Sequence, residues 1–130
     1  MASFNKFNSF VEALAEKVHN LGSDTLTVAL CNTAPTAANT QLSDLTQISY
    51  TNLSSRTLSS VTSSQTGGTY TLDAADLVLT ASGSVATFRY VVLYNDTATN
   101  DELIGYYDYG SAVDLLNGET FTITFDASGI

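Results

Sequence analysis

The spacing of apolar residues changes near residue 22, and this change limits the folds that are open to the chain. Before it, apolar side chains recur every three or four residues: Phe4, Phe7, Phe10, Val11, Leu14 and Val18. After it, they alternate at every second position, as in Leu26, Val28 and Leu30. A helix presents one face every three or four residues, and a strand presents it every second residue. The sequence therefore predicts one N-terminal amphipathic α-helix, about residues 4–20, followed by strands and turns.

The ends of the predicted helix carry residues with the usual capping chemistry. Ser3 or Asn5 is placed to cap the first turn, and Gly22 suits a left-handed residue after the last turn. The phenylalanines on this short helix favour docking on the chain's own sheet, and docking on a partner is the alternative.

The longest predicted strand covers residues 85–94 and is apolar on both faces. Strict alternation gives one face of Val85, Val91 and Leu93, and another of Phe88, Tyr90, Val92 and Tyr94. Such a strand is central in its sheet, or a partner covers its second face.

The next predicted strand, residues 102–109, pairs with it across a polar loop and contains Gly105, where a neighbouring segment approaches closely. Asn117-Gly118 predicts a type I′ hairpin that joins residues 113–116 to residues 119–126.

These elements define a fold class and a domain organisation. The chain has 130 residues and a mass of 13.8 kDa, which suits a single domain spanning residues 1–130. Short strands separated by turns rich in Gly, Asn, Asp and Ser are typical of β-sandwiches. We expect a mainly β protein: an antiparallel, jelly-roll-like β-sandwich over about residues 24–128, preceded by the single helix.

The charge of the chain excludes two classes of partner. The net charge is −9, and its four cationic residues are scattered at Lys6, Lys17, Arg56 and Arg89. Nucleic acids and anionic membranes need clustered cations, so we expect neither as a partner. Charged residues make up only 13% of the chain, and the Ser- and Thr-rich surface that replaces them suits contact with other proteins.

No catalytic, cofactor or metal site is predicted. A chain with one histidine and one cysteine, His19 and Cys31, has no His/Cys metal cluster, and Cys31 ends an apolar strand as an inert thiol does. His19 fits the negative end of the helix dipole better than a catalytic role. The loop with Asp96, Asp101 and Glu102 lacks the central glycine of a calcium loop, which favours a solvated hairpin tip. We expect a protein that is not an enzyme.

Arg89 and a group of aromatic residues are the candidate interface. An unpaired guanidinium within an apolar strand is costly, so Arg89 pairs either with Asp108 or Glu102 on the next strand, or across an interface. Clustered tyrosines suit either an interface or core filling. The residues of the predicted interface are Phe4, Phe7, Arg89, Tyr90, Tyr94, Tyr106, Tyr107 and Tyr109.

Several segments resemble a known group of proteins. They are SFNKFNSFVE (residues 3–12), VHNLGSDTL (18–26), RYVVLYNDT (89–97), LIGYYDYG (103–110) and the final strand at 121–126. They resemble small structural proteins of tailed phages, similar to head decoration (cement) proteins. The resemblance implies a non-enzymatic virion protein that is made in the host cytoplasm, binds the outer surface of the head and stabilises contacts between capsomers. The implied partners are the major capsid protein and further copies of the chain, as a homodimer or homotrimer.

One departure and two alternatives accompany this resemblance. The chain stops at Ile130, just after Ala127-Ser128-Gly129, where more apolar residues are expected, so a terminal arm that grips the capsid is expected to be short. The first alternative is a phage tail or fibre-associated module that binds host surface glycans. The second is a hydrolase.

Overall fold

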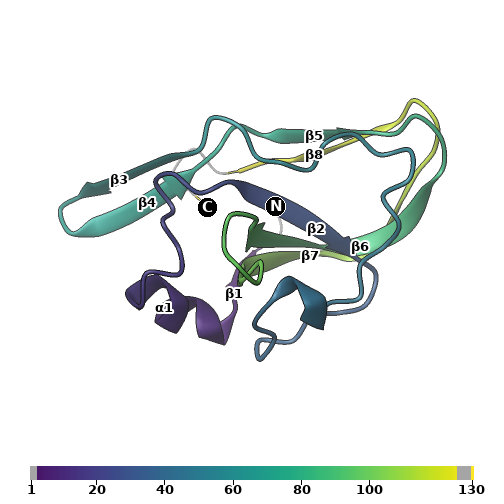
Figure 1. Cartoon of the computed structure of the whole chain (residues 1–130). Coiled ribbons are helices and arrows are strands. Elements are labelled where there is room, and N and C mark those ends of the chain that lie inside the picture. Colours follow the sequence, from purple (N-terminus) through teal and green to yellow (C-terminus); the bar gives the residue numbers. More distant parts are fainter. Residues whose placement is uncertain (1–2, 126–129) are drawn as a thin grey trace.

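The computed structural model describes residues 3–125 and residue 130, and it is mainly β with antiparallel strands (Figure 1). The elements in chain order are β1 (Phe4–Lys6), α1 (Asn8–Ala15), β2 (Leu26–Cys31), the 3-10 turn η1 (Leu42–Asp44), β3 (Thr62–Thr66), β4 (Thr69–Asp73), β5 (Leu77–Thr80), β6 (Val85–Asn95), β7 (Leu103–Leu115) and β8 (Thr120–Ile123). The predicted final strand continued to Asp126, and its end lies outside the described residues, as do residues 127–129.

The main sheet has four strands in the order β1-β7-β6-β2, all antiparallel. The predicted pairing of the strand after residue 85 with the strand after residue 102 is confirmed, because β6 and β7 are neighbours joined by the polar loop. A second layer holds two further pairs, β5-β8 and the hairpin β3-β4, and the hairpin projects beyond the main sheet (Figure 1).

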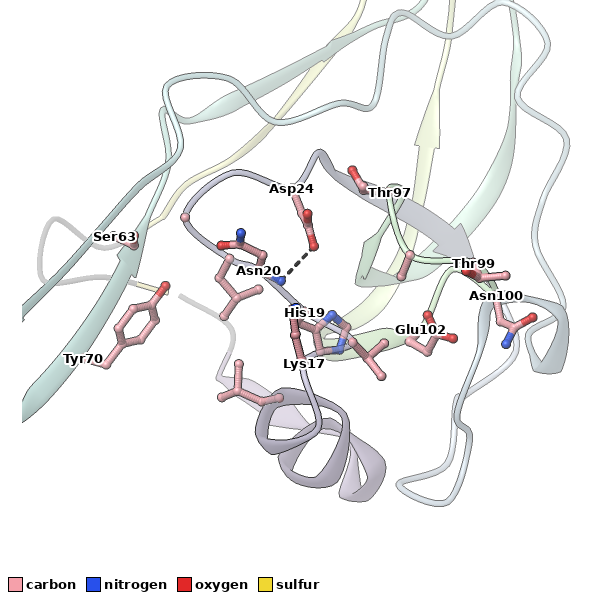
Figure 2. Close-up of a pocket in the computed structure, with 15 residues that line it drawn as sticks. Lys17, His19, Asn20, Asp24, Ser63, Tyr70, Thr97, Thr99, Asn100 and Glu102 are labelled. Atoms are coloured by element: carbon pink, nitrogen blue, oxygen red, sulfur yellow. Dashed lines mark hydrogen bonds between the residues drawn. The ribbon is translucent and has the colours of Figure 1, made fainter.

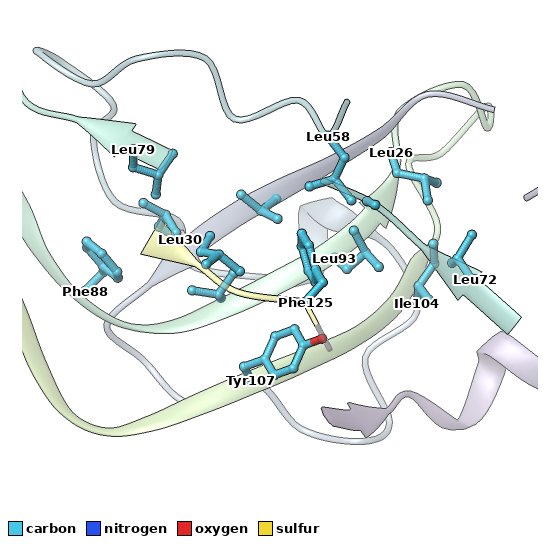
Figure 3. Close-up of a cluster of buried hydrophobic side chains, with 14 of the residues drawn as sticks. Leu26, Leu30, Leu58, Leu72, Leu79, Phe88, Leu93, Ile104, Tyr107 and Phe125 are labelled. Carbon is cyan, nitrogen blue, oxygen red and sulfur yellow. The ribbon is translucent and has the colours of Figure 1, made fainter. Parts of the chain in front are cut away.

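The main hydrophobic core lies between these layers (Figure 3). Leu79 of β5 and Ile123 of β8 are fully buried there against Leu30 and Val91 of the main sheet. The rings of Phe88 and Phe121 meet edge to face, with centroids 5.3 Å apart. Burial of a Leu, Ile or Phe side chain contributes about 1.5–3 kcal/mol, so each of these side chains adds substantially to the stability of the contact between layers.

The opposite face of the main sheet is also covered, by the chain itself. A second cluster contains Phe7, Cys31, Val92 and Leu103, and leucines from the segment around η1 pack on it. β6 lies between β7 and β2, which confirms its predicted central position. The apolar second face of β6 is covered by the loop that follows β2. The sequence had left open whether the chain itself or a partner covers this face.

The predicted faces of β6 were wrong at one residue. Phe88 packs in the main core with Val91 and Leu93, and not beside Val92 in the second cluster. The register between β6 and β7 shifts on both sides of Phe88. Irregularities of this kind interrupt the alternation of side chains, so strict periodicity assigned Phe88 to the wrong face.

The α-helix is shorter than the predicted residues 4–20, because its first turn is replaced by strand β1. Phe4 pairs with Tyr107 of β7, and its ring lies over Gly105. A Cβ atom on residue 105 would overlap the Phe4 ring and come within 2.9 Å of the Asn5 carbonyl oxygen. The predicted close approach at Gly105 is therefore confirmed, and the segment that approaches it is β1, which pairs with β7 there.

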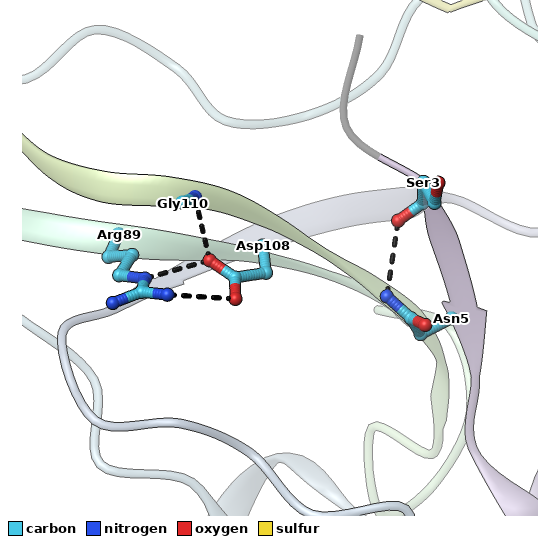
Figure 4. A network of polar contacts seen from close by, with 5 residues as sticks. All are labelled: Ser3, Asn5, Arg89, Asp108 and Gly110. Carbon is cyan, nitrogen blue, oxygen red and sulfur yellow. Dashed lines mark hydrogen bonds and ion pairs between the residues drawn. The ribbon is translucent and has the colours of Figure 1, made fainter.

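The predicted helix caps at Ser3 or Asn5 were also wrong. Phe7 occupies the N-cap position with an extended backbone and no side-chain cap bond. The Asn5 amide instead donates to the Ser3 carbonyl at 3.1 Å (Figure 4). Burial of Phe7 in the second cluster, with no exposed surface, fixes the start of the helix in place of a cap.

The helix ends in a Schellman motif at Lys17, and not at the predicted Gly22. Lys17 has a φ of 67°, and the Val18 N–H donates to the Ala13 carbonyl at 2.9 Å. This bond around a left-handed residue defines the motif. Gly22 serves a different purpose, because a Cβ there would lie 3.3 Å from the Ser63 Oγ of β3.

Asn117-Gly118 forms a turn, but the predicted type I′ hairpin was wrong. Gly118 has a φ of 85°, whereas Asn117 does not have the positive φ that a type I′ turn requires. The Glu119 N–H donates to the Leu116 carbonyl at 2.9 Å, which together with the Gly118 φ gives a type II turn. Type II geometry splays the flanking strands, so β7 pairs with β6 while β8 crosses to β5.

Candidate functional site

Three residues of the predicted interface are buried inside the chain. Phe7, Tyr94 and Tyr107 are each less than a tenth exposed, and the Phe4 and Tyr107 rings lie 5.4 Å apart. Burial raises the pKa of Tyr107 to about 12, which keeps its hydroxyl neutral. In this structure these side chains fill the core, so they offer no surface to a partner.

Arg89 pairs with Asp108 on the neighbouring strand, as one of the two interpretations predicted (Figure 4). Its Nε donates to Oδ1 at 2.8 Å and one terminal nitrogen donates to Oδ2 at 3.1 Å, while the Gly110 N–H donates to Oδ1 at 2.8 Å. Hydrogen bonding from Arg89 lowers the pKa of Asp108. Both side chains are more than a third exposed, so solvent screens the pair. The other four residues of the predicted interface are half-buried: Phe4 and Tyr109 pack against the main core, and Tyr90 and Tyr106 pack against the second cluster.

The apolar residues that remain exposed lie mainly elsewhere. Val11, Leu14 and Val18 are 53%, 42% and 38% exposed, and they form one stripe along α1 and the turn that follows it. We call these three residues the α1 stripe. Phe10 on the same helix packs against the main core, so the helix docks through its phenylalanine and leaves the aliphatic stripe outside. The predicted docking of the helix on the chain's own sheet is therefore confirmed for only part of its apolar face.

A cleft of about 860 Å³ lies beside the α1 stripe (Figure 2). Its walls come from three parts of the chain: the segment that follows α1, the β3-β4 hairpin and the loop between β6 and β7. Leu14 and Val18 line one side, and Tyr70 of β4, which is 50% exposed, lines another. We call this feature the α1–β4 cleft.

The base of the cleft is organised by Asn95, which is completely buried at the end of β6. Its Oδ1 accepts hydrogen bonds from the backbone N–H groups of Thr97 and Ala98, at 3.0 and 3.1 Å. Its Nδ2 lies 2.9 Å from Nδ1 of His19 and donates to Oδ2 of Asp24 at 2.6 Å. One side chain therefore connects the loop after β6 to the segment after α1.

The protonation of His19 follows from this network. Since Asn95 Nδ2 is a donor, Nδ1 of His19 is the acceptor and the proton of the neutral imidazole is on Nε2. Burial lowers the pKa of His19 below its ordinary value of 6.5, while the carboxylates of Glu102 and Asp24 act in the opposite direction. His19 is thus a neutral donor at pH 7, and not a helix-end cation as its position in the sequence suggested.

Two polar atoms at the base of the cleft have no hydrogen-bond partner among residues 3–125 and 130. They are Nε2 of His19 and Oε2 of Glu102, and both are buried. Figure 2 shows His19 and Glu102 close together, with Tyr70 across the cleft from them. One donor and one acceptor therefore lie beneath the surface of the cleft, and both are covered in this structure.

The remaining candidate chemistry is limited. Burial raises the pKa of the Cys31 thiol to about 11, which makes it a poor nucleophile. Within residues 3–125 and 130, no three His, Cys, Asp or Glu side chains gather as ligands for a metal ion. In the same part of the chain, no helix has the length and apolar character needed to cross a bilayer.

Sequence reasoning missed most of this cleft. Tyr70 was not singled out, and Glu102 was considered only as a calcium ligand or a partner of Arg89. Asn95 carried one local signal, because Asn at the start of a polar loop often accepts from the backbone two residues later. Nothing in the sequence indicated its contacts with His19 and Asp24, which are more than seventy residues away.

Comparisons of the chain with protein-family models, with curated proteins and with solved structures each found no match.

Proposed function

We propose that this chain is a non-enzymatic capsid decoration (cement) protein, which binds the outside of a tailed-phage head and stabilises contacts between capsomers. The observation that carries the proposal is the α1 stripe, whose members are each more than a third exposed. A helix that leaves aliphatic residues exposed beside a surface with few charged residues is suited to docking on another protein. The sequence resemblance supplies the identity of that partner, the major capsid protein.

A jelly-roll-like sandwich belongs to the same proposal. The antiparallel sheets and the main core between them support it. A rigid β-sandwich of this kind adds contact area across capsomer boundaries without a conformational change. Burial of the α1 stripe contributes a few kcal/mol per copy at about 25 cal/mol per Å², and many copies on one head add their effects.

The test is binding of the purified chain to undecorated phage heads, followed by sedimentation. We expect saturable binding, at least tenfold weaker for Val11→Ser. The matched control is Val78→Ser on β5, a valine that is 50% exposed in the other layer. We expect the control to bind like the unaltered chain.

Two results would overturn the proposal. One is the absence of saturable binding to heads, and the other is binding to isolated tails or host cells in its place. Light scattering of the free protein tests the associated expectation of a homodimer or homotrimer.

A further inference from the structure

The base of the α1–β4 cleft holds a donor and an acceptor that no group in the described part of the chain satisfies. His19 is only 5% exposed and its Nε2 has no hydrogen-bond partner there, and the buried Oε2 of the half-buried Glu102 has none either. Leaving a buried polar group unsatisfied costs about 1–3 kcal/mol. A ligand group that forms hydrogen bonds with both atoms therefore gains more binding free energy than one that forms them on the open surface.

The chemistry of the two atoms restricts that group. Nε2–H of neutral His19 requires an acceptor, and the Glu102 carboxylate requires a donor. A hydroxyl group supplies both at once. A cation is attracted by the carboxylate but cannot accept a hydrogen bond from the His19 N–H. An anion is repelled by the carboxylates of Glu102 and Asp24. The base of the cleft thus favours a neutral ligand with hydroxyl groups.

The walls of the cleft agree with a saccharide ring. Tyr70 presents a half-exposed aromatic face, and Leu14 and Val18 supply aliphatic surface. The rim carries short hydroxyl and amide side chains that suit further hydroxyl groups: Asn20, Ser63, Thr97, Thr99 and Asn100. The volume of about 860 Å³ falls in the usual range of ligand sites, roughly 300–1,000 Å³.

We propose that the α1–β4 cleft binds a neutral saccharide, with one ring hydroxyl accepting from His19 Nε2 and donating to Glu102, and the ring resting on Tyr70. Both polar atoms are covered in the free protein, so binding requires the half-buried Glu102 side chain to turn toward the cleft. The site shares Leu14 and Val18 with the α1 stripe, whereas Val11 does not line the cleft and Tyr70 does not belong to the stripe, so variants at Val11 and Tyr70 distinguish the two proposals.

The experiment is a titration of the ¹⁵N-labelled full chain with neutral methyl glycosides and disaccharides, followed by amide chemical shifts. We expect saturable shifts for at least one sugar at millimolar concentration, confined to the three segments that form the cleft. Glucuronate, which carries a negative charge, is expected to bind at least tenfold more weakly than the matching neutral sugar.

Variants separate this site from a general surface effect. Tyr70→Ala removes an exposed ring and is expected to weaken binding about tenfold, whereas Val78→Ala on β5 leaves it unchanged. Val11→Ser retains saccharide binding and Tyr70→Ala retains binding to heads, so the failure of one proposal is distinct from the failure of the other.

Three results would overturn the saccharide site. The first is the absence of any saturable shift across the panel, which would leave the two polar atoms to water alone. The second is a set of shifts outside the cleft. The third is equal binding by Tyr70→Ala and the unaltered chain.

Discussion

Asn95 and His19 meet through Nδ2 and Nδ1 at 2.9 Å, and this contact sets the tautomer of the chain's one histidine. The two backbone donors on Asn95 Oδ1 fix the orientation of the amide, so the imidazole is the acceptor at Nδ1. We expect ¹⁵N spectra of the imidazole to show a neutral ring protonated at Nε2 at pH 7. A ring protonated at Nδ1, or a charged ring, would contradict the network described for the base of the cleft.

Asn95→Ala is expected to destabilise the protein by about 2–4 kcal/mol, because it removes a buried amide and leaves its former partners unsatisfied. Asn100→Ala is the matched control, since Asn100 lies in the same loop and is exposed. We expect the control to change the free energy of unfolding by about 0.5 kcal/mol or less. Urea denaturation of both variants measures the difference, and equal effects would refute the role of Asn95.

The lowered pKa of His19 predicts a loss of stability in mild acid. Below the ordinary pKa of 6.5, the unfolded chain takes up a proton that the folded chain refuses. Stability is therefore full above pH 6.5 and declines as the pH falls toward the folded pKa. The carboxylates of Asp24 and Glu102, which face the ring, reduce the effect without reversing it. Urea midpoints measured across this pH range check the prediction, and His19→Gln is expected to flatten the profile between neutral pH and the onset of carboxylate titration.

Lys17→Gly is expected to stabilise the protein by about 0.5–1 kcal/mol, because glycine adopts the left-handed C′ position of the Schellman motif without strain. Lys6→Gly is the control, since Lys6 lies in strand β1, where glycine costs conformational entropy. Thermal unfolding should raise the midpoint for the first variant and lower it for the second. A fall in the midpoint for Lys17→Gly would show that the lysine side chain contributes more than the strain costs.

Gly105→Ala is expected to destabilise the protein by about 1–3 kcal/mol, because the new methyl group must displace the Phe4 ring and press on the β1 backbone. In a Phe4→Ala background the ring is absent, so the same substitution should cost less. A double-mutant cycle measured by urea unfolding gives the coupling. Additive effects would show that Phe4 does not lie over residue 105.

Local sequence patterns predicted the pairing of β6 with β7 and the close approach at Gly105. The pairing depends on segments that are neighbours along the chain, and the close approach depends on one residue that has no Cβ atom. The pattern failed at both ends of the helix for a tertiary reason. The Phe4 ring over Gly105 and the burial of Phe7 outweigh the helical spacing of the phenylalanines, so residues 4–6 join the sheet.

The candidate site was less predictable than the fold. The tyrosines of the predicted interface were identified by their clustering on two strands expected to pair, and clustering does not distinguish a core tyrosine from an exposed one. Tyr94 and Tyr107 are buried because a layer of the same chain covers each of them. The α1 stripe was visible in the sequence, but its exposure depends on how the helix is tilted onto β7.

The amino-acid sequence by itself determined two properties: the alternation that makes the chain mainly β, and the small share of charged residues. These are local properties, because they depend on the chemistry of each residue and of its near neighbours. Tertiary structure alone decided that Asn95, His19, Asp24 and Glu102 share one base and that Tyr70 faces them across a cleft. Those residues are brought together by the closure of long loops, and the free energy of closing a loop depends on the packing of the whole fold.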